Sequence, residues 1–130
     1  MNPLKKILVL DSKAGEGHKE MLETVLEMHE METGNKTSIK IDNVRGQGIA
    51  MRLPRDYDGY LLHLSQVETR RDLPSLREEQ PWSFIYGIVG QGTVNIVPEI
   101  RGCLDATYFV LAKFDYQQII EDVLKGRERK

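Results

Sequence analysis

Five short apolar runs, spread evenly along the chain, constrain what this sequence can fold into more than any other feature. Each is five to seven residues long, and most of the stretches between them carry helix signals. The runs occupy residues 6–10, 38–44, 59–64, 83–89 and 107–113. Apolar runs of this length are typical of strands buried in a parallel sheet, and the alternation within residues 38–44 indicates a half-covered strand. Helices between such strands form right-handed crossovers, so the pattern predicts an α/β domain.

The helix signals between the runs differ in strength. Residues 21–29 place Met21, Leu22, Val25, Leu26 and His29 on one predicted apolar stripe, with glutamates on the other side. Gly34 and Asn35 then predict the end of that helix. A short helix is expected to start near Pro74, another around residues 97–104, and a last one over residues 116–124. Residues 49–53 can support only about one turn before Pro54.

Five strands in a chain of 130 residues favour the flavodoxin-like strand order 2-1-3-4-5. We therefore predict a three-layer, doubly wound, five-stranded parallel sheet with helices on both faces. Residues 1–124 are expected to form a single flavodoxin-like domain, and residues 125–130 a basic C-terminal tail. Cys103 is the only cysteine and cannot form an intramolecular disulfide, and no apolar run is long enough to span a membrane. These features predict a cytoplasmic protein with no membrane partner.

Charge is distributed unevenly along the chain. The formal net charge is only −2, which argues against general nucleic-acid binding. Residues 11–32 nevertheless hold seven acidic residues against two lysines, whereas residues 40–55 hold four basic residues against Asp42 alone. One interpretation is a solvated helix face beside a basic loop. The other is a docking surface for a charged partner.

The loop after the first strand is a candidate phosphate site. In a doubly wound sheet, ligands bind beyond the carboxyl ends of the strands where the strand order reverses, which brings the loops after strands 1 and 3 together. Glycines let the backbone approach an anion, and the following helix offers free N–H groups. The residues assigned to this site are Ser12, Lys13, Ala14, Gly15, Glu16, Gly17 and His18. The alternative is a strand-to-helix turn with a capping acid and no ligand.

Two further loops would complete a site for a flat ligand. The loop after the fourth strand contains two glycines, which would let a ring lie against the backbone. The residues assigned to the ring are Ser65 and Gln66 on one side and Gly90, Gln91, Gly92 and Thr93 on the other. A turn without a ligand is the alternative for the second loop.

Metal binding and covalent catalysis are not indicated. His18, His29 and His63 fall on separate predicted elements, and with a single cysteine they make no metal-ligand pattern. Ser12 lacks the surroundings of a nucleophile elbow, and no Walker-type phosphate loop occurs. We assign no catalytic residue and no metal ligand.

Two stretches resemble the ribonucleotide reductase stimulatory proteins, a family of small flavodoxin-like carriers of flavin mononucleotide (FMN). Residues 7–15, Ile-Leu-Val-Leu-Asp-Ser-Lys-Ala-Gly, are similar to that family's first strand and phosphate loop. Residues 86–96, Tyr-Gly-Ile-Val-Gly-Gln-Gly-Thr-Val-Asn-Ile, resemble its flavin-lining segment. The resemblance implies an electron-transfer protein with FMN as the cofactor, and a redox partner or a ribonucleotide reductase subunit as the partner. The cofactor would then supply the chemistry.

The sequence departs from that family in two loops, and two other readings stay open. Ala14, Glu16 and Gly17 replace the family's hydroxyl and Asn side chains, and residues 64–71 contain no glycine where the family's loop is glycine-rich. One alternative is a cofactor-free flavodoxin-like protein-interaction domain that docks through the acidic first helix or through Arg70 and Arg71. The other starts from residues 12–18, which resemble the Gly-x-Gly-His loop of GT-B glycosyltransferases and imply the N-terminal-type subunit of a two-subunit enzyme.

Overall fold

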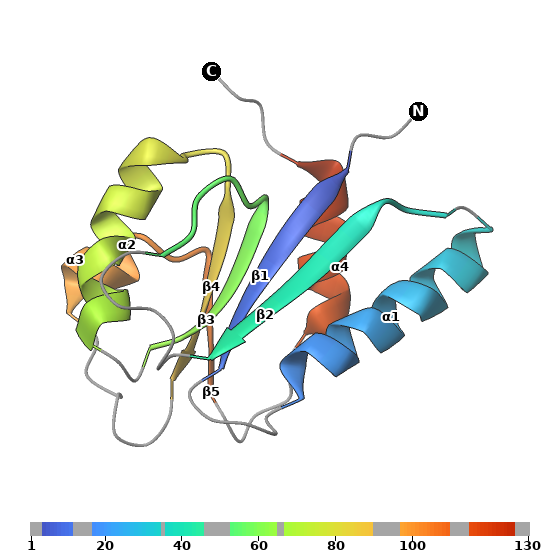
Figure 1. The fold of residues 1–130 in the computed structure, drawn as a ribbon, viewed down its shortest axis with the longest axis horizontal. Helices are drawn as coiled ribbons and strands as arrows, with labels where there is room; N and C mark the ends of the chain where they lie inside the picture. The colour runs from blue at the N-terminus through green and yellow to red at the C-terminus, as the bar shows by residue number, and fades with distance from the viewer. Residues whose placement is uncertain are drawn as a thin grey trace.

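The computed structural model of the chain describes residues 4–11, 17–34, 36–45, 53–64, 67–89, 97–109 and 115–126. Its strands are β1 (Lys5–Asp11), β2 (Ile39–Arg45), β3 (Gly59–His63), β4 (Phe84–Val89) and β5 (Ala106–Phe109). Its helices are α1 (His18–Thr33), α2 (Val67–Glu79), α3 (Pro98–Arg101) and α4 (Tyr116–Lys125), as Figure 1 shows. The strands are parallel and lie in the order β2-β1-β3-β4-β5. This confirms the predicted flavodoxin-like fold and its strand order.

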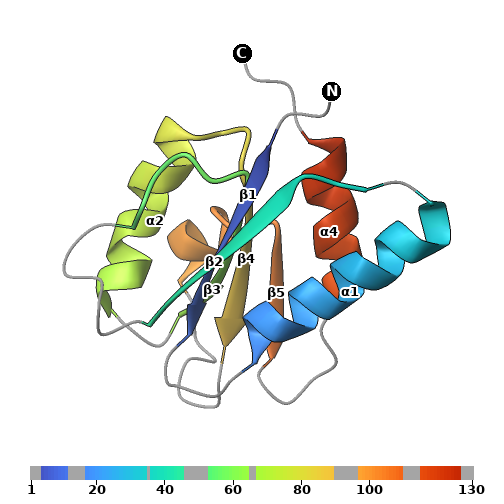
Figure 2. The ribbon, with the colours of Figure 1, turned by 45° about the vertical axis from the view of Figure 1, so that its right-hand side comes forward.

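The sheet is the middle of three layers. Helices α1 and α4 pack together on one face, and α2 and α3 cover the other (Figures 1 and 2). A hydrophobic core lies on each face of the sheet, and β1 contributes alternate side chains to the two. Ile7 and Val9 join the core on the α1–α4 side, whereas Leu8 and Leu10 join the core on the α2–α3 side. Every residue of β3 and β4 is buried, as expected for central strands of a doubly wound sheet.

Gly59 shows how closely the layers approach. A Cβ added to this residue would lie 2.7 Å from Val123 Cγ2 of α4 and 3.4 Å from Ile7 Cγ1 of β1. Real Cβ atoms essentially never approach another atom as closely as 2.7 Å, so glycine at the start of β3 lets α4 rest directly on the sheet.

Glycines determine where α1 begins and ends. Gly17 is the N-cap residue with φ 77°, and Gly34 ends the helix with φ 72° while its N–H donates to Glu30 O at 2.9 Å. The predicted stop at Gly34 is therefore confirmed. The predicted apolar stripe is correct for Leu22 and Leu26, which are buried, but wrong for Met21, which is exposed. Because successive residues of a helix are about 100° apart, Met21 lies beyond the buried arc centred on Leu22 and Leu26.

Two other helices differ from the sequence predictions. Helix α2 begins at Val67 instead of near Pro74, so the proline lies inside it. A proline in a helix interior removes one hydrogen bond and crowds the preceding turn. Tertiary packing outweighs that penalty, because Thr69, Leu73, Leu76 and Gln80 form one buried stripe against the sheet. Helix α3 is shorter than predicted and spans only Pro98–Arg101.

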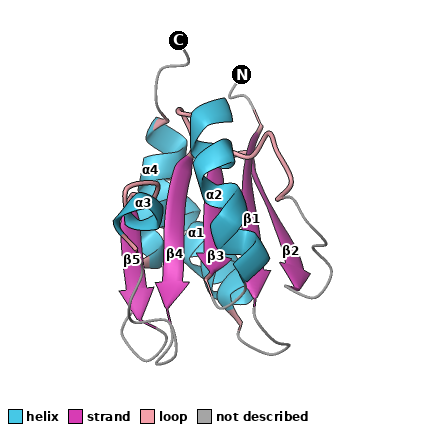
Figure 3. Ribbon diagram, turned by 90° about the vertical axis from the view of Figure 1, so that its left-hand side faces the viewer, coloured by secondary structure: helices cyan, strands magenta, loops and turns pink. Residues whose placement is uncertain are grey.

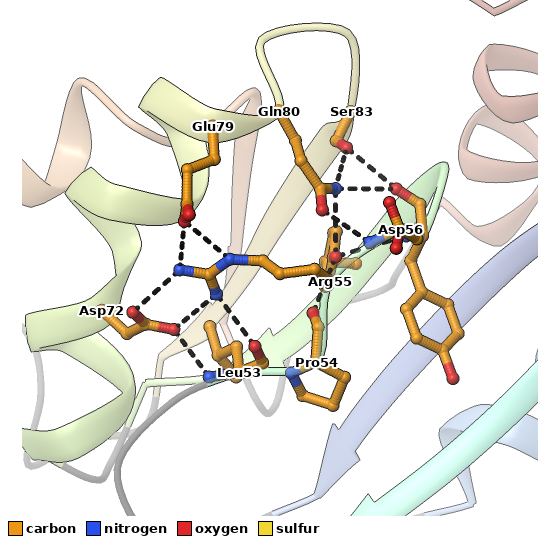
Figure 4. Close-up of polar contacts among 10 residues, drawn as sticks. Leu53, Pro54, Arg55, Asp56, Asp72, Glu79, Gln80 and Ser83 are labelled. Carbon is orange, nitrogen blue, oxygen red and sulfur yellow. Dashed lines mark hydrogen bonds and ion pairs between the residues drawn. The ribbon is translucent and has the colours of Figure 1, made fainter.

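An irregular segment, residues 53–58, lies against α2 in the connection between β2 and β3; we call it the 53–58 strap. Leu53 is fully buried in the α2–α3 side core, and its N–H donates to Asp72 Oδ2 at 2.6 Å. The Arg55 guanidinium contacts Asp72 Oδ2 at 2.8 Å, Glu79 Oε2 at 2.6 Å and Leu53 O at 2.9 Å (Figure 4). The hydrogen bond to Asp72, followed by that to Glu79, raises the pKa of Arg55, although burial opposes the shift. The strap is thus held in place by a charged side chain.

The end of the strap joins a buried polar network. Asp56 adopts a left-handed backbone conformation with φ 69°, and its N–H donates to Gln80 Oε1 at 2.5 Å. The Gln80 amide nitrogen donates to Tyr60 Oη at 3.2 Å and to Ser83 Oγ at 2.9 Å (Figure 4). These bonds connect the strap, the end of α2 and the start of β4, and so offset the backbone strain at Asp56.

Candidate functional site

The carboxyl ends of the parallel strands lie along one edge of the sheet, where Figure 3 shows all five arrowheads. Strand β1 ends at Asp11, paired in register with Arg45 of β2, and β3 ends at His63. The order reverses at β1, which lies between β2 and β3. The structure therefore places the topological switch point where the sequence predicts it.

Two of the predicted phosphate-loop residues, Gly17 and His18, belong to the described part of the chain. Gly17 caps α1, so it lies at the helix start as predicted. His18 is only 6% exposed, and its Nδ1 lies 2.9 Å from Tyr116 Oη at the start of α4. This contact ties the first turn of α1 to α4. The His18 ring is thus engaged with Tyr116 inside the domain, and the assignment of Gly17 and His18 to a phosphate site stays a prediction.

The other residues assigned to a ligand lie outside the described residues, and their roles stay predictions. They are Ser12, Lys13, Ala14, Gly15 and Glu16 after β1, Ser65 and Gln66 after β3, and Gly90, Gln91, Gly92 and Thr93 after β4. Within the described ranges, no group of three or more His, Cys, Asp or Glu side chains could hold a metal ion.

Arg70, one of the two arginines predicted as a docking point, has an internal role. Its Nη1 donates to Leu64 O, the carbonyl just after β3, at 2.6 Å, and the side chain is half-buried. Arg70 therefore caps the end of a central strand, and Arg71 alone of the two is exposed. Arg70 and Arg71 therefore do not form a pair of exposed arginines for docking.

The outward face of α1 carries three exposed methionines, which we call the methionine face: Met21 at 47%, Met28 at 54% and Met31 at 78% exposure. The first two are seven residues apart and the third is three residues further on, so all three project from one side of the helix. Helix α1 lies next to α4 and β2 (Figures 1 and 2) and packs there through Leu22 and Leu26, which belong to the core, whereas the three methionines are exposed. The other large apolar residues exposed in the described chain are Leu4, before β1, and Val97, before α3.

The sequence contains a signal for this face that the stripe analysis missed. Residues 21, 28 and 31 follow the i, i+7, i+10 spacing of a second stripe, separate from the buried stripe of Leu22 and Leu26. The predicted apolar stripe included Met21 with the buried residues, so this second stripe was not recognised.

No protein-family model and no curated protein matches this sequence. Solved structures do match. A CheY-like response regulator receiver domain protein from Methanospirillum hungatei JF-1 is 16% identical with a TM-score of 0.54, over 95% of this chain and 93% of that one. A response regulator receiver domain protein from Clostridium thermocellum is 11% identical with a TM-score of 0.52, over 94% and 92%. The BeF3-activated DrrB receiver domain is 14% identical with a TM-score of 0.54, over 95% and 99%. At these identities the likeness establishes the fold alone, which is the flavodoxin-like fold.

The predicted function as an FMN electron carrier is corrected by these comparisons. The solved structures that share the fold are receiver domains of response regulators, and the resemblance to ribonucleotide reductase stimulatory proteins is not supported. The predicted partners, a redox protein or a ribonucleotide reductase subunit, depended on that resemblance and are not supported either. The resemblance rested on residues 7–15 and 86–96, which include most of β1 and part of β4. A buried strand followed by a glycine-bearing turn belongs to this type of sheet in general and does not specify a cofactor.

Proposed function

We propose that this chain is a cofactor-free protein-interaction domain that docks a partner protein on the methionine face of α1. The proposal rests on the exposure of Met21, Met28 and Met31 on one side of one helix. Methionine is flexible and polarisable, so it packs against apolar surfaces of varied shape. Burying such side chains against a partner is favourable by roughly 25 cal/mol per Å² of apolar area.

The fold comparison supports an interaction role. The matched solved structures are described as receiver domains of response regulators, a description that concerns signal reception and not flavin chemistry. Of the two docking surfaces predicted from sequence, the pair Arg70–Arg71 is weakened because Arg70 binds Leu64 O internally. The acidic first helix keeps an open outward face and is the better candidate.

Site-directed photocrosslinking in cells tests the proposal. Thr24 lies between Met21 and Met28 on the exposed side of α1, and Glu78 is exposed on α2. A photoreactive residue at position 24 is expected to crosslink a discrete partner, and one at position 78 is not. Adding Met21→Ser, Met28→Ser and Met31→Ser should abolish the position-24 product. Crosslinks that survive those three substitutions, or that form only at position 78, would show that the partner docks elsewhere.

A further inference from the structure

The methionine face is bordered by acidic side chains that have no partners in the described structure. Glu20 and Glu27 each precede a methionine of the face, and Glu32 follows the last one. Neither a hydrogen bond nor an ion pair joins these three carboxylates to any described residue. The neighbouring acids differ, because Glu23 lies 3.8 Å from Lys19 Nζ and Glu30 accepts the Thr37 N–H at 2.7 Å. Three free carboxylates therefore lie along α1 next to the exposed methionines.

Helix α1 also breaks two rules of ordinary surface helices. Its last turn contains acidic residues and no basic one, which opposes the helix dipole. Its outward face exposes long apolar side chains at positions where polar side chains would not lower the stability of the fold. Local departures of this kind are expected where function constrains a surface. A partner with both basic and apolar side chains would neutralise the acidic residues and cover the exposed methionines.

The shape of the face indicates what kind of segment fits it. The rise of an α-helix places Met21 and Met28 about 10 Å apart and Met21 and Met31 about 15 Å apart along the axis. A partner helix with apolar residues at i, i+3 or i+4, and i+7 has the same repeat. Strand addition is excluded on this face because the α1 backbone is already hydrogen-bonded within the helix. The Thr24 hydroxyl is likewise satisfied by Glu20 O at 2.9 Å.

We infer that the outward face of α1 binds a cationic amphipathic helix of a partner protein, with its apolar stripe on Met21, Met28 and Met31 and its Lys or Arg residues on Glu20, Glu27 and Glu32. This inference rests on the proposed function and specifies the chemistry of the partner. Apolar burial supplies the affinity, and the charges direct orientation and the rate of encounter.

Two other occupants fit the same face less well. A second copy of this chain would bring its own glutamates against these glutamates, because a two-fold interface pairs each surface with itself. Residues 127–130 read Arg-Glu-Arg-Lys and have no apolar side chain to cover the methionines. Both are distinguishable from a partner helix by experiment.

The probe is a fluorescein-labelled synthetic peptide of leucine and lysine, about five helical turns long, with leucine at the i, i+3 or i+4, i+7 positions. Fluorescence anisotropy with the full chain measures its affinity. One control peptide has the same composition in scrambled order, and another carries glutamate in place of lysine. We expect micromolar binding of the first peptide, and binding of each control weaker by roughly tenfold or more.

Variants then locate the peptide on α1. The triple change Met21→Ser, Met28→Ser, Met31→Ser should weaken binding about tenfold or more, and Glu20→Gln, Glu27→Gln, Glu32→Gln should weaken it and flatten its dependence on salt. The matched controls are Glu78→Gln with Glu99→Gln, which are exposed acids on α2 and α3, and Val97→Ser. These should leave affinity unchanged. All the variants change exposed side chains, and circular dichroism checks that each is folded.

Several results would overturn the inference. Equal binding of the scrambled peptide, or equal losses in the control variants, would mean unspecific attraction to negative charge. A dimer in sedimentation that Met28→Ser dissolves would assign the face to a second copy. Peptide affinity gained on deleting residues 127–130 would assign the face to those residues. If the peptide fails to bind while crosslinking at position 24 persists, the proposed function stands and the partner chemistry is wrong; if both fail, both are wrong.

Discussion

Arg55 illustrates at the residue scale how one charged side chain holds an irregular segment in place. It spans Asp72, Glu79 and Leu53 O, while Asp72 also accepts the Leu53 N–H. We expect Arg55→Ala to lower the free energy of unfolding by about 3 kcal/mol, because it leaves a nearly buried carboxylate without its cation. Urea unfolding followed by circular dichroism measures this. Glu79→Gln is the matched control, since that side chain is 45% exposed and its loss should cost less than about 1 kcal/mol. Equal losses would contradict the assigned role of Asp72.

Tyr57 gives the domain a pH dependence on the alkaline side. Burial, followed by its 2.6 Å hydrogen bond to Asp42, raises the pKa of Tyr57 from 10.0 to about 12. The folded chain therefore favours the neutral phenol more than the unfolded chain does. This stabilisation is complete below pH 10 and is lost as pH rises through the folded pKa near 12.

Tyr57→Phe is expected to lose less stability over that pH range than the wild type. Burial also raises the pKa values of Tyr60, Tyr86 and Tyr108, so the variant should retain part of the alkaline slope. Urea unfolding at pH values on both sides of 10, with tyrosinate absorbance as a second readout, measures the difference. Identical slopes in the two proteins would mean that Tyr57 ionises as freely in the fold as in the unfolded chain.

At the scale of elements, strands were easier to predict than helices. An apolar run such as residues 6–10 has one natural position in a parallel sheet, and Gly34 defines a helix end by its own backbone preference. By contrast, α2 continues through Pro74 because of a buried stripe that only the assembled sheet creates. Met21 was misplaced because an apolar residue is ambiguous until a neighbouring element covers it. The 53–58 strap depends on Arg55 meeting Asp72 and Glu79, which are distant in sequence.

In the candidate site, too, some features follow from local sequence patterns and others depend on how the elements pack. The topology of a doubly wound sheet predicts that the loops after β1 and β3 meet, and the observed strand order agrees. Cofactor identity does not follow from topology, because a strand and a glycine-bearing turn are compatible with many ligands or with none. The methionine face was detectable from spacing, but its exposure depends on which side of α1 packs against α4 and β2.

Glu32 offers a prediction at the element scale in which stability and binding move in opposite directions. It lies in the last turn of α1, where the helix dipole disfavours negative charge and no basic residue compensates. Glu32→Lys should therefore raise the free energy of unfolding by roughly 0.5 kcal/mol, with Glu32→Gln intermediate and both gains reduced at high salt. The same Lys variant should weaken binding of the leucine–lysine peptide. Urea titrations and anisotropy on one preparation measure both, and a variant that gained stability without losing affinity would remove Glu32 from the docking surface.

Across the whole molecule, one sheet supports two separate cores, and β1 contributes alternate side chains to each. Ile119 on α4 belongs to one core and Leu73 on α2 to the other, and both are fully buried. Trp82, the only tryptophan, is half-buried in the connection between α2 and β4. If one core is lost, β1 is uncovered on one face and the other core is destabilised as well. We therefore expect the domain to unfold in a single transition.

Ile119→Ala and Leu73→Ala test this coupling from opposite faces. Each should lower the free energy of unfolding by about 2–5 kcal/mol, and in each variant the denaturation curves from Trp82 fluorescence and from circular dichroism should coincide. Ile119→Ala is the more informative, since Ile119 lies in the core on the opposite face of the sheet from α2, the helix that precedes Trp82, and its substitution should still shift the tryptophan signal fully. If its fluorescence curve stayed at the wild-type midpoint while circular dichroism moved, the α1–α4 layer would be unfolding on its own. A partner seated on α1 would then stabilise only that layer. In the coupled case, binding at the methionine face raises the stability of the entire domain by mass action, and the Trp82 midpoint should rise with peptide concentration.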